Sequence, residues 1–395
     1  MTQHRKGPAA PGDTATAQAL RDTATAQALR DTAGGSEVSG AACGVVHVVL
    51  PNDIDDPSGP SGGNRYDREV CAGLAALRWT VREHSARGAW PTPSAGDLVA
   101  LDELLTTLPT GAPVLVDGLV ASAAPDTMAA HADRLRLVVL VHMPFGDTDP
   151  AARPAERRAL SAATVIIATS EWTRRRLIQL YDLRGIAVAV PGVSPAPPAQ
   201  GTERGGALLS VAVLGPHKGQ DVLVEALTRL ADREWTCVCA GALDRDPDFV
   251  HTLRARIDTA GLSDRIQLPG PQTGAALDAL YASADLLVHP SLGETYGMVA
   301  AEALARGIPV LATTAKGLPD AVGRTAAGTV PGLLIPPDDP DALAGALERW
   351  LTDSALRRSL RAAARSRRED LTDWIVTART IAATLGNLPT NPAPR

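Results

Sequence analysis

The stretch SLGETYGMVAAEALARGIPV, residues 291–310, is the most informative part of the chain. It follows the apolar run ADLLVHP, so we expect a strand that ends at Pro290, a short loop, and a helix that begins near Gly297. Gly307 and Pro309 form a helix stop, after which the next strand begins. A helix N-terminus offers free backbone N–H groups and a partial positive charge, so this unit predicts a phosphate site at Gly297.

Two carboxylates lie in this unit, with seven residues between them. Glu294 is in the predicted loop and is expected to meet whatever is attached to the phosphate. Glu302 lies further along the helix and can accept hydrogen bonds from the hydroxyl pair of a sugar. The spacing alone is unspecific, and an alanine-rich packing helix with two solvated acids is the alternative. The whole run, with GETYG, EALA and GIPV, is far more specific.

This run resembles the donor-sugar site of the retaining, family 4 glycosyltransferases of GT-B fold. In that family the pattern is Glu, seven residues, Glu, with Phe or Tyr and then Gly after the first acid, and the match is complete. The resemblance covers residues 44–385 and is strongest over 208–336. It implies a nucleotide diphosphate sugar as donor, retention of the anomeric configuration, no cofactor and no required metal.

The rest of the chain predicts an α/β fold. From Gly44 onward strand and helix patterns alternate, which is typical of parallel sheets, and they start again after the proline-rich linker at 191–201. We therefore predict two Rossmann-like domains facing a cleft, at 43–195 for the acceptor and 196–385 for the nucleotide sugar. As in family members, the last helical stretch, 374–385, is expected to cross back to the first domain.

Two terminal segments are predicted to lie outside these domains. The nonapeptide DTATAQALR occurs at 13–21 and again at 22–30, within an extension over 1–42 that we expect to be disordered. Two short copies are too few for a solenoid. Residues 386–395 form a predicted tail.

The glycine-rich segment PSGGN follows the first predicted strand and opens the first predicted helix. Glycines let a backbone approach a ligand closely, although a surface turn is the alternative. The resemblance places Gly62, Gly63 and Asn64 near the acceptor and the reacting sugar. Tyr66 and Asp67 follow, and we expect both to face the cleft.

His142 ends the predicted strand at 137–141 and matches the family's histidine that contacts the donor sugar. A lone histidine is more often structural, but its place in this pattern favours a role in the site. We therefore predict Glu294 and His142 as the catalytic residues.

Lys218 lies in the segment LGPHKG, between a strand and a helix, where it can pair with a diphosphate as a point charge. The segment resembles the family's PxKG motif. Many members carry an arginine five residues before the lysine, where this chain has Val213. Either another basic residue substitutes, or Lys218 and the helix ends act alone. The predicted donor-binding residues are Lys218, Glu302, Gly297, Tyr296, Met298, Gly215, Gly241 and Thr295.

Composition excludes some classes of function. The chain of 395 residues has a net charge of −6, which argues against a general nucleic-acid binder. Asp-x-Asp triplets occur at four scattered places, so they are no evidence for a metal site. The four cysteines are expected to be free thiols, and no apolar run approaches ~20 residues, so we expect a cytoplasmic protein without a transmembrane segment. Peripheral membrane contact and the oligomeric state stay open.

The sequence thus predicts a retaining hexosyltransferase that moves a sugar to a hydroxyl acceptor it does not identify. UDP-sugar is the first choice of donor and GDP-sugar the second, by family frequency. A sugar-nucleotide epimerase or a phosphorylase of similar fold is the alternative among enzymes. A two-lobed small-molecule binding protein without turnover is the alternative outside them.

Overall fold

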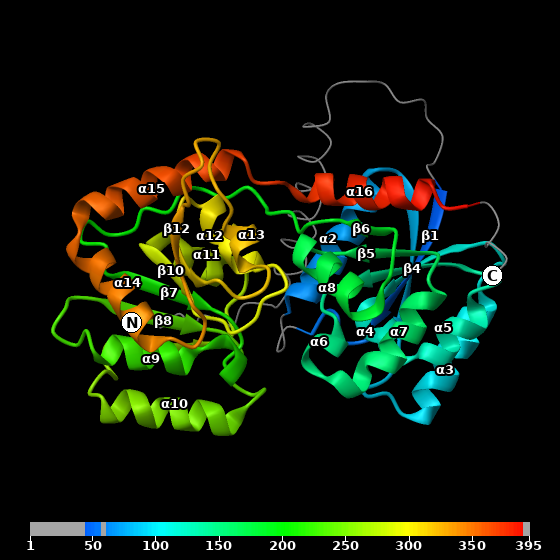
Figure 1. Ribbon diagram of the computed structural model, residues 1–395, viewed down its shortest axis with the longest axis horizontal. Helices are drawn as coiled ribbons and strands as arrows, with labels where there is room; N and C mark the ends of the chain where they lie inside the picture. Colours follow the sequence, from blue (N-terminus) through cyan, green and yellow to red (C-terminus); the bar gives the residue numbers. More distant parts are fainter. Residues whose placement is uncertain (1–43, 57–60, 390–395) are drawn as a thin grey trace, which may run out of the picture.

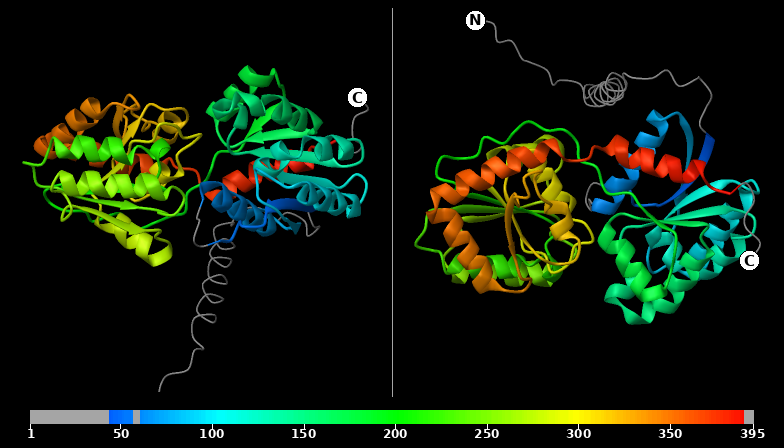
Figure 2. Two further views of the ribbon diagram at one scale, coloured as in Figure 1. Left: turned by 90° about the horizontal axis from the view of Figure 1, so that it is seen from below. Right: turned by 45° about the horizontal axis from the view of Figure 1, so that its top comes forward.

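The computed structural model describes residues 44–56 and 61–389. They form two units, each built on a six-stranded sheet whose paired strands are all parallel (Figure 1). Helices cover both faces of each sheet (Figure 2). The predicted α/β fold of two Rossmann-like halves is therefore confirmed. The predicted extension at 1–42 lies outside the described residues, as do residues 390–395 of the predicted tail.

The N-terminal sheet has the strand order β2-β1-β3-β4-β5-β6. Its strands are β1 (Gly44–Pro51), β2 (Trp79–Ala86), β3 (Pro113–Asp117), β4 (Arg136–Val141), β5 (Val165–Ala168) and β6 (Ile186–Val188). Its helices are α2 (Gly62–Ala76), α3 (Ala95–Thr107), α4 (Gly118–Ala123), α5 (Pro125–His131), α6 (Phe145–Thr148), the 3₁₀ helix η1 (Pro150–Ala152), α7 (Arg153–Ala162) and α8 (Glu171–Tyr181).

The C-terminal sheet has the order β12-β11-β10-β7-β8-β9. Its strands are β7 (Ala207–Val211), β8 (Thr236–Ala240), β9 (Ile266–Gly270), β10 (Leu286–His289), β11 (Val310–Thr313) and β12 (Gly332–Ile335). Its helices are η2 (Pro216–Lys218), α9 (Gln220–Thr228), α10 (Pro247–Thr259), α11 (Gly274–Ser283), α12 (Met298–Ala305), α13 (Leu318–Val322), α14 (Pro340–Thr352) and α15 (Ser354–Glu369).

The last helix, α16 (Trp374–Gly386), belongs in space to the N-terminal unit, where it packs on α2 (Figure 1). The rings of Trp374 and Tyr66 meet edge to face with their centroids 5.6 Å apart. A Cβ atom at Gly73 would lie 2.5 Å from that of Ala378, so the close approach of the two helices requires glycine there. The chain therefore crosses between the units twice.

Sequence patterns missed some elements because these lack the apolar character of a buried strand. Edge strand β2 reads WTVREHSA, and only its two end residues are buried. Residues 268–270 belong to β9, where the pairing with β8 is irregular. Tyr66 was wrongly expected in the cleft, because its ring is buried and its hydroxyl donates to Ala189 O at 2.7 Å.

Apolar side chains on both faces of each sheet form the cores, which are built mainly from Val, Leu and Ala. Cys71, Cys237 and Cys239 are buried and free, as predicted, whereas Cys43 lies outside the described residues. No helix in the described ranges has both the length and the apolar content that crossing a bilayer requires.

Candidate active site

The loop between β10 and α12 lies beyond the carboxyl end of a central strand, which is where open α/β sheets bind ligands. Gly297 precedes α12 with φ of 106°, a conformation that strongly favours glycine, and no side chain caps the helix. A Cβ atom there would also lie 2.6 Å from Leu318 Cδ2. The first N–H groups of α12 are thus left without a capping side chain, as the sequence predicted for a phosphate site.

Glu294 lies in this loop between two nitrogen atoms from other segments. Lys218 Nζ donates to Glu294 Oε1 at 2.5 Å, and His289 Nε2 lies 3.1 Å from the same oxygen. Burial raises the pKa of Glu294, but the hydrogen bond with His289 and the charge of Lys218 outweigh it and hold that pKa well below its ordinary value. Glu294 is therefore a carboxylate at any physiological pH.

Lys218 reaches Glu294 because η2 packs directly on the loop. Leu292 N and Ser291 Oγ both donate to His217 O, at 2.9 and 3.1 Å. Gly219 has φ of 70°, and a Cβ atom there would lie 2.3 Å from Pro290 O. Gly219 thus permits the close contact with the loop that places Lys218 beside Glu294. Lys218 ends the 3₁₀ helix, and α9 begins at Gln220, two residues further along the chain.

Glu302 lies on α12, with both carboxylate oxygens engaged. Tyr281 Oη donates to Oε2 at 2.9 Å, and Arg65 of the N-terminal unit forms an ion pair with Oε1. The acceptors predicted for sugar hydroxyls are therefore held by protein groups in this structure.

The predicted glycine loop is the first turn of α2, with Ser61 as its N-cap accepting from Asn64 N at 3.0 Å. A Cβ atom at Gly62 would lie 3.5 Å from Met298 Sδ, and one at Gly63 would lie 3.5 Å from His142. Met298 is the first residue of α12. The N-termini of a helix from each unit therefore face one space, where both partial charges are positive.

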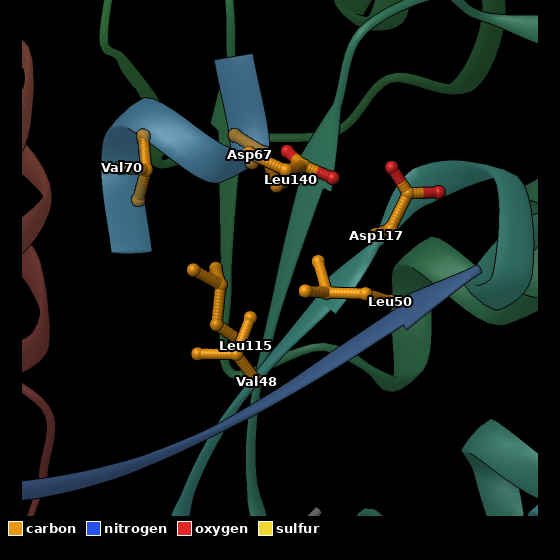
Figure 3. Close-up of a pocket in the computed structure, with 7 residues that line it drawn as sticks. All are labelled: Val48, Leu50, Asp67, Val70, Leu115, Asp117 and Leu140. Carbon is orange, nitrogen blue, oxygen red and sulfur yellow. The ribbon is translucent and has the colours of Figure 1, made fainter. Parts of the chain in front are cut away.

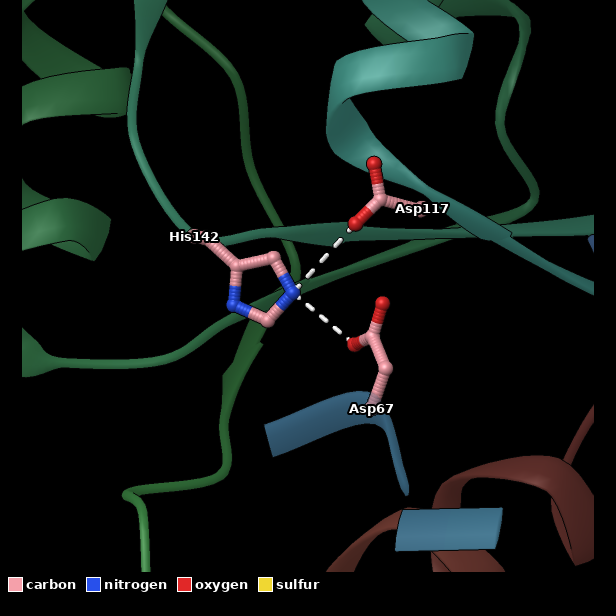
Figure 4. A group of neighbouring side chains, drawn as sticks. All are labelled: Asp67, Asp117 and His142. Carbon is pink, nitrogen blue, oxygen red and sulfur yellow. Dashed lines mark hydrogen bonds and ion pairs between the residues drawn. The ribbon is translucent and has the colours of Figure 1, made fainter. Parts of the chain in front are cut away.

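His142 follows β4 and bridges two buried carboxylates (Figure 4). Its Nε2 lies 2.9 Å from Asp67 Oδ1 and 3.4 Å from Asp117 Oδ2. Asp117 also accepts from Leu119 N at 2.6 Å at the start of α4. The two aspartates line a pocket together with Val48, Leu50, Val70, Leu115 and Leu140 (Figure 3).

These three residues are a group with metal-ligand chemistry in the described part of the chain, since their ligand atoms lie within 4.8 Å of one another. A metal would have to replace the proton on Nε2. An imidazolium donating to two carboxylates accounts for the same contacts without one. Asp67, expected in the cleft, is buried beneath the histidine instead.

The aspartates are expected to keep His142 protonated. Burial lowers the pKa of His142, but the charge of Asp67 and the hydrogen bond with Asp117 outweigh it and raise that pKa to about 10. Because the folded pKa exceeds the ordinary value, this group stabilises the fold fully below pH ~6.5, and the stabilisation is lost as the pH rises toward ~10. Burial also raises the pKa of Asp67, so the contribution of this group to stability is likewise lost as the pH rises.

Ring NMR signals of His142 should therefore show an imidazolium at pH 8.5, where free histidine is neutral. Asp67→Asn should move the transition toward the ordinary pKa, because it removes the nearer charge. Titration of the wild-type ring near pH 6.5 would show that the aspartates do not hold the proton.

The remaining predicted donor residues are placed by packing. A Cβ atom at Gly241 would lie 1.8 Å from Ala212 O, so that glycine is required by the backbone of the neighbouring strand's loop. Gly215 caps η2 with extended backbone. Gly317 N donates to Glu294 O at 2.7 Å and packs on Thr295 O, which ties the loop to α13. Tyr296 is half-buried in the same loop.

A network of charged side chains also links the two units beside this loop. Lys316 reaches across to the N-terminal unit, where its Nζ lies 2.6 Å from Asp147 Oδ2. Its φ of 50° is unusual for a residue with a side chain. Arg176 Nε lies 2.5 Å from the other oxygen of Asp147, so at least one arginine of the 174–176 run faces this network.

Two Rossmann-like units, each built on a six-stranded parallel sheet, are the architecture of the GT-B fold. Residues 199–367 match the model of the family glycosyl transferases group 1.

Curated relatives are D-inositol 3-phosphate glycosyltransferases. That of Jonesia denitrificans is 31% identical over 245 residues, covering 56% of this chain and 57% of its own. That of Salinispora arenicola is 34% identical over 248 residues, covering 55% and 54%. The chain thus spans about half the length of the curated relatives it matches.

Solved structures support the fold. The sucrose-phosphate synthase of Thermosynechococcus elongatus superposes with a TM-score of 0.70 at 20% identity, covering 86% of this chain and 98% of its own. The Anabaena protein HepE, solved with UDP and glucose, gives 0.69 at 19% identity, covering 87% and 100%. Both show the GT-B architecture for nearly the whole chain.

Proposed function

We propose that this protein is a retaining glycosyltransferase that moves a sugar from a nucleotide diphosphate sugar to a hydroxyl acceptor. One observation carries the proposal. The ionised Glu294, paired with Lys218, lies just before the uncapped N-terminus of α12, and Glu302 lies one turn along that helix. Such an arrangement offers partners for a diphosphate, a ribose and a sugar that becomes cationic during transfer.

Each group has a role in this proposal. The N-terminus of α12 and Lys218 bind the diphosphate and stabilise the leaving group as its charge develops. Glu302 accepts hydrogen bonds from the ribose hydroxyls, and Glu294 binds sugar hydroxyls and stabilises the cationic sugar. His142, beside Gly63 on the opposite unit, donates to the donor sugar.

UDP-sugar is the proposed donor, with GDP-sugar second. The Anabaena neighbour was solved with UDP-glucose, which supports the choice of UDP as the first probe. The activity for which the curated relatives are named makes D-inositol 3-phosphate the first acceptor to test.

Thermal-shift screening against UDP, GDP and ADP, with their sugars, tests the donor site. A nucleotide at 100 times its Kd should stabilise the fold by about 2.7 kcal/mol, which raises Tm by several degrees. Lys218→Ala should weaken binding at least about tenfold, because a charged hydrogen bond to phosphate is lost. Arg233→Ala, which removes an exposed cation of the same unit, is the matched control.

Failure of every nucleotide to stabilise the protein would contradict the proposal. Turnover separates the remaining alternatives. Loss of the donor without transfer of its sugar would favour an epimerase, and a requirement for free phosphate would favour a phosphorylase. Tight binding with no turnover, unaffected by Glu294→Ala, would favour a binding protein.

A further inference from the structure

The cations beside the N-terminus of α12 are too few to balance the charge of a bound diphosphate. Lys218 is paired with Glu294 in the loop before α12, and Glu294 already offsets its charge at 2.5 Å. A bound diphosphate brings about two negative charges, so a second cation is needed nearby. Val213 is apolar and cannot supply it.

Arg65 is the basic side chain whose present partner a nucleotide would take away. Its guanidinium forms an ion pair with Glu302 Oε1, while Tyr281 holds Oε2 at 2.9 Å. If Glu302 binds the ribose, as proposed above, the ribose hydroxyls compete with Arg65 for the same oxygen. Binding of the nucleotide then releases a guanidinium into the cleft.

A diphosphate bound at the N-terminus of α12 would lie within reach of that guanidinium. Glu302 lies four residues beyond Met298, so the ion pair and the helix N-terminus are about 6 Å apart along α12. Met298 in turn contacts Gly62, in the same turn of α2 as Arg65. An arginine side chain spans this distance by rotamer change, so α2 need not move.

Two other cations near the loop are held more firmly. Lys316 is paired at 2.6 Å with Asp147, which is itself half-buried and bound to Arg176. Arg306 donates to Glu302 O at 3.0 Å and to Asp278 at 2.5 Å. It lies at the C-terminal end of α12, away from the N-terminus of that helix. Arg65 is more than a third exposed, at 39%, and has room to change partner.

We propose that Arg65 exchanges partners, binding Glu302 in the ligand-free protein and the diphosphate of the donor in the donor-bound protein. This rests on the proposed function and assigns the second cation of its diphosphate site to the N-terminal unit. A guanidinium suits both partners, because it forms paired hydrogen bonds with carboxylate and with phosphate. Donor binding would thereby join the two units through the ligand.

The exchange has a signature that a merely structural role would not have. A nucleoside without phosphates must displace Arg65 from Glu302 and then makes no favourable contact with the released guanidinium. A nucleoside diphosphate must displace Arg65 but then binds it. Removing the guanidinium should therefore tighten the first ligand and weaken the second.

Calorimetric titration of the full chain with UDP and with uridine tests this, and GDP with guanosine is run in parallel. Arg65→Ala should weaken UDP about tenfold and tighten uridine about threefold, which changes their ratio about thirtyfold. Arg65→Lys, which keeps the charge, should retain most of the affinity for UDP. Arg68→Ala is the matched control on the same helix, since Arg68 pairs with Asp55 and Glu83 and should leave both ligands unchanged.

The outcomes separate this inference from the function on which it rests. Wild-type protein that binds no nucleotide overturns both. Wild-type protein that binds UDP, with equal changes for UDP and uridine in Arg65→Ala, overturns the partner exchange alone. Loss of UDP affinity in Lys316→Ala, with none in Arg65→Ala, assigns the second cation to Lys316 and also overturns it.

Discussion

Glu294→Gln is expected to lower the rate of sugar transfer by about 100- to 1,000-fold, the usual range for losing one preorganised electrostatic group. Glutamine keeps the shape and the hydrogen-bonding oxygen but removes the negative charge. That charge is secured in the resting protein, because His289 and Lys218 hold the pKa of Glu294 well below its ordinary value. It is therefore available when the sugar becomes cationic.

Initial rates of nucleotide release from UDP-glucose, with and without D-inositol 3-phosphate, measure the effect, and calorimetry of UDP measures binding. Affinity for UDP should change by less than about threefold, because Lys218 is retained. Glu225→Gln, on the exposed face of α9, is the control of equal charge change. A transfer rate within about tenfold of wild type would remove Glu294 from the reaction.

Asp285→Ala is expected to lower the free energy of unfolding by about 3–5 kcal/mol, since it removes a buried carboxylate and leaves a half-buried arginine partner and two backbone donors unpaired. The Asp285 side chain is fully buried and accepts from Thr202 N at 2.6 Å, Ala207 N at 2.9 Å and Arg361 Nη2 at 2.6 Å. One carboxylate thus joins Thr202, the start of β7 and α15. Asp285 directly precedes β10, the strand that leads into the loop of the candidate site.

Urea unfolding and Tm should both report the loss, with Tm falling by about 10 °C for a unit of this size. Asp285→Asn should lose less, because it keeps one acceptor oxygen. Asp341→Ala removes an exposed carboxylate of α14 and should change stability by less than about 1 kcal/mol. A loss below ~1 kcal/mol for Asp285→Ala would show that the neighbouring donors find other partners.

The loop between β10 and α12, and α12 itself, could be predicted because their sequence signals are local. An apolar run, a glycine with positive φ and a Gly–Pro stop lie within some 27 residues, and the backbone follows them closely. Lys218 was also predictable from its motif, and the structure adds that Gly219 allows the approach to Pro290. The alternation of strand and helix gave the fold class for the same reason.

Edge strand β2 and the position of Tyr66 were not predictable in this way. A strand at the edge keeps polar side chains, so its sequence resembles a loop. Tyr66 carries a polar hydroxyl, and only the packing of α16 on α2 encloses its ring.

The sequence by itself therefore determined the two α/β units, the start of α12 after a glycine, and the positions of the two glutamates in the loop and on the helix. Tertiary structure alone decided which charges meet: Arg65 with Glu302, 237 residues apart, and His142 with Asp67, 75 apart. Local patterns specify backbone conformation, whereas these pairs depend on how separate strands and helices are brought together. The partners of the catalytic groups, and the contact between the two units, arise only at that level.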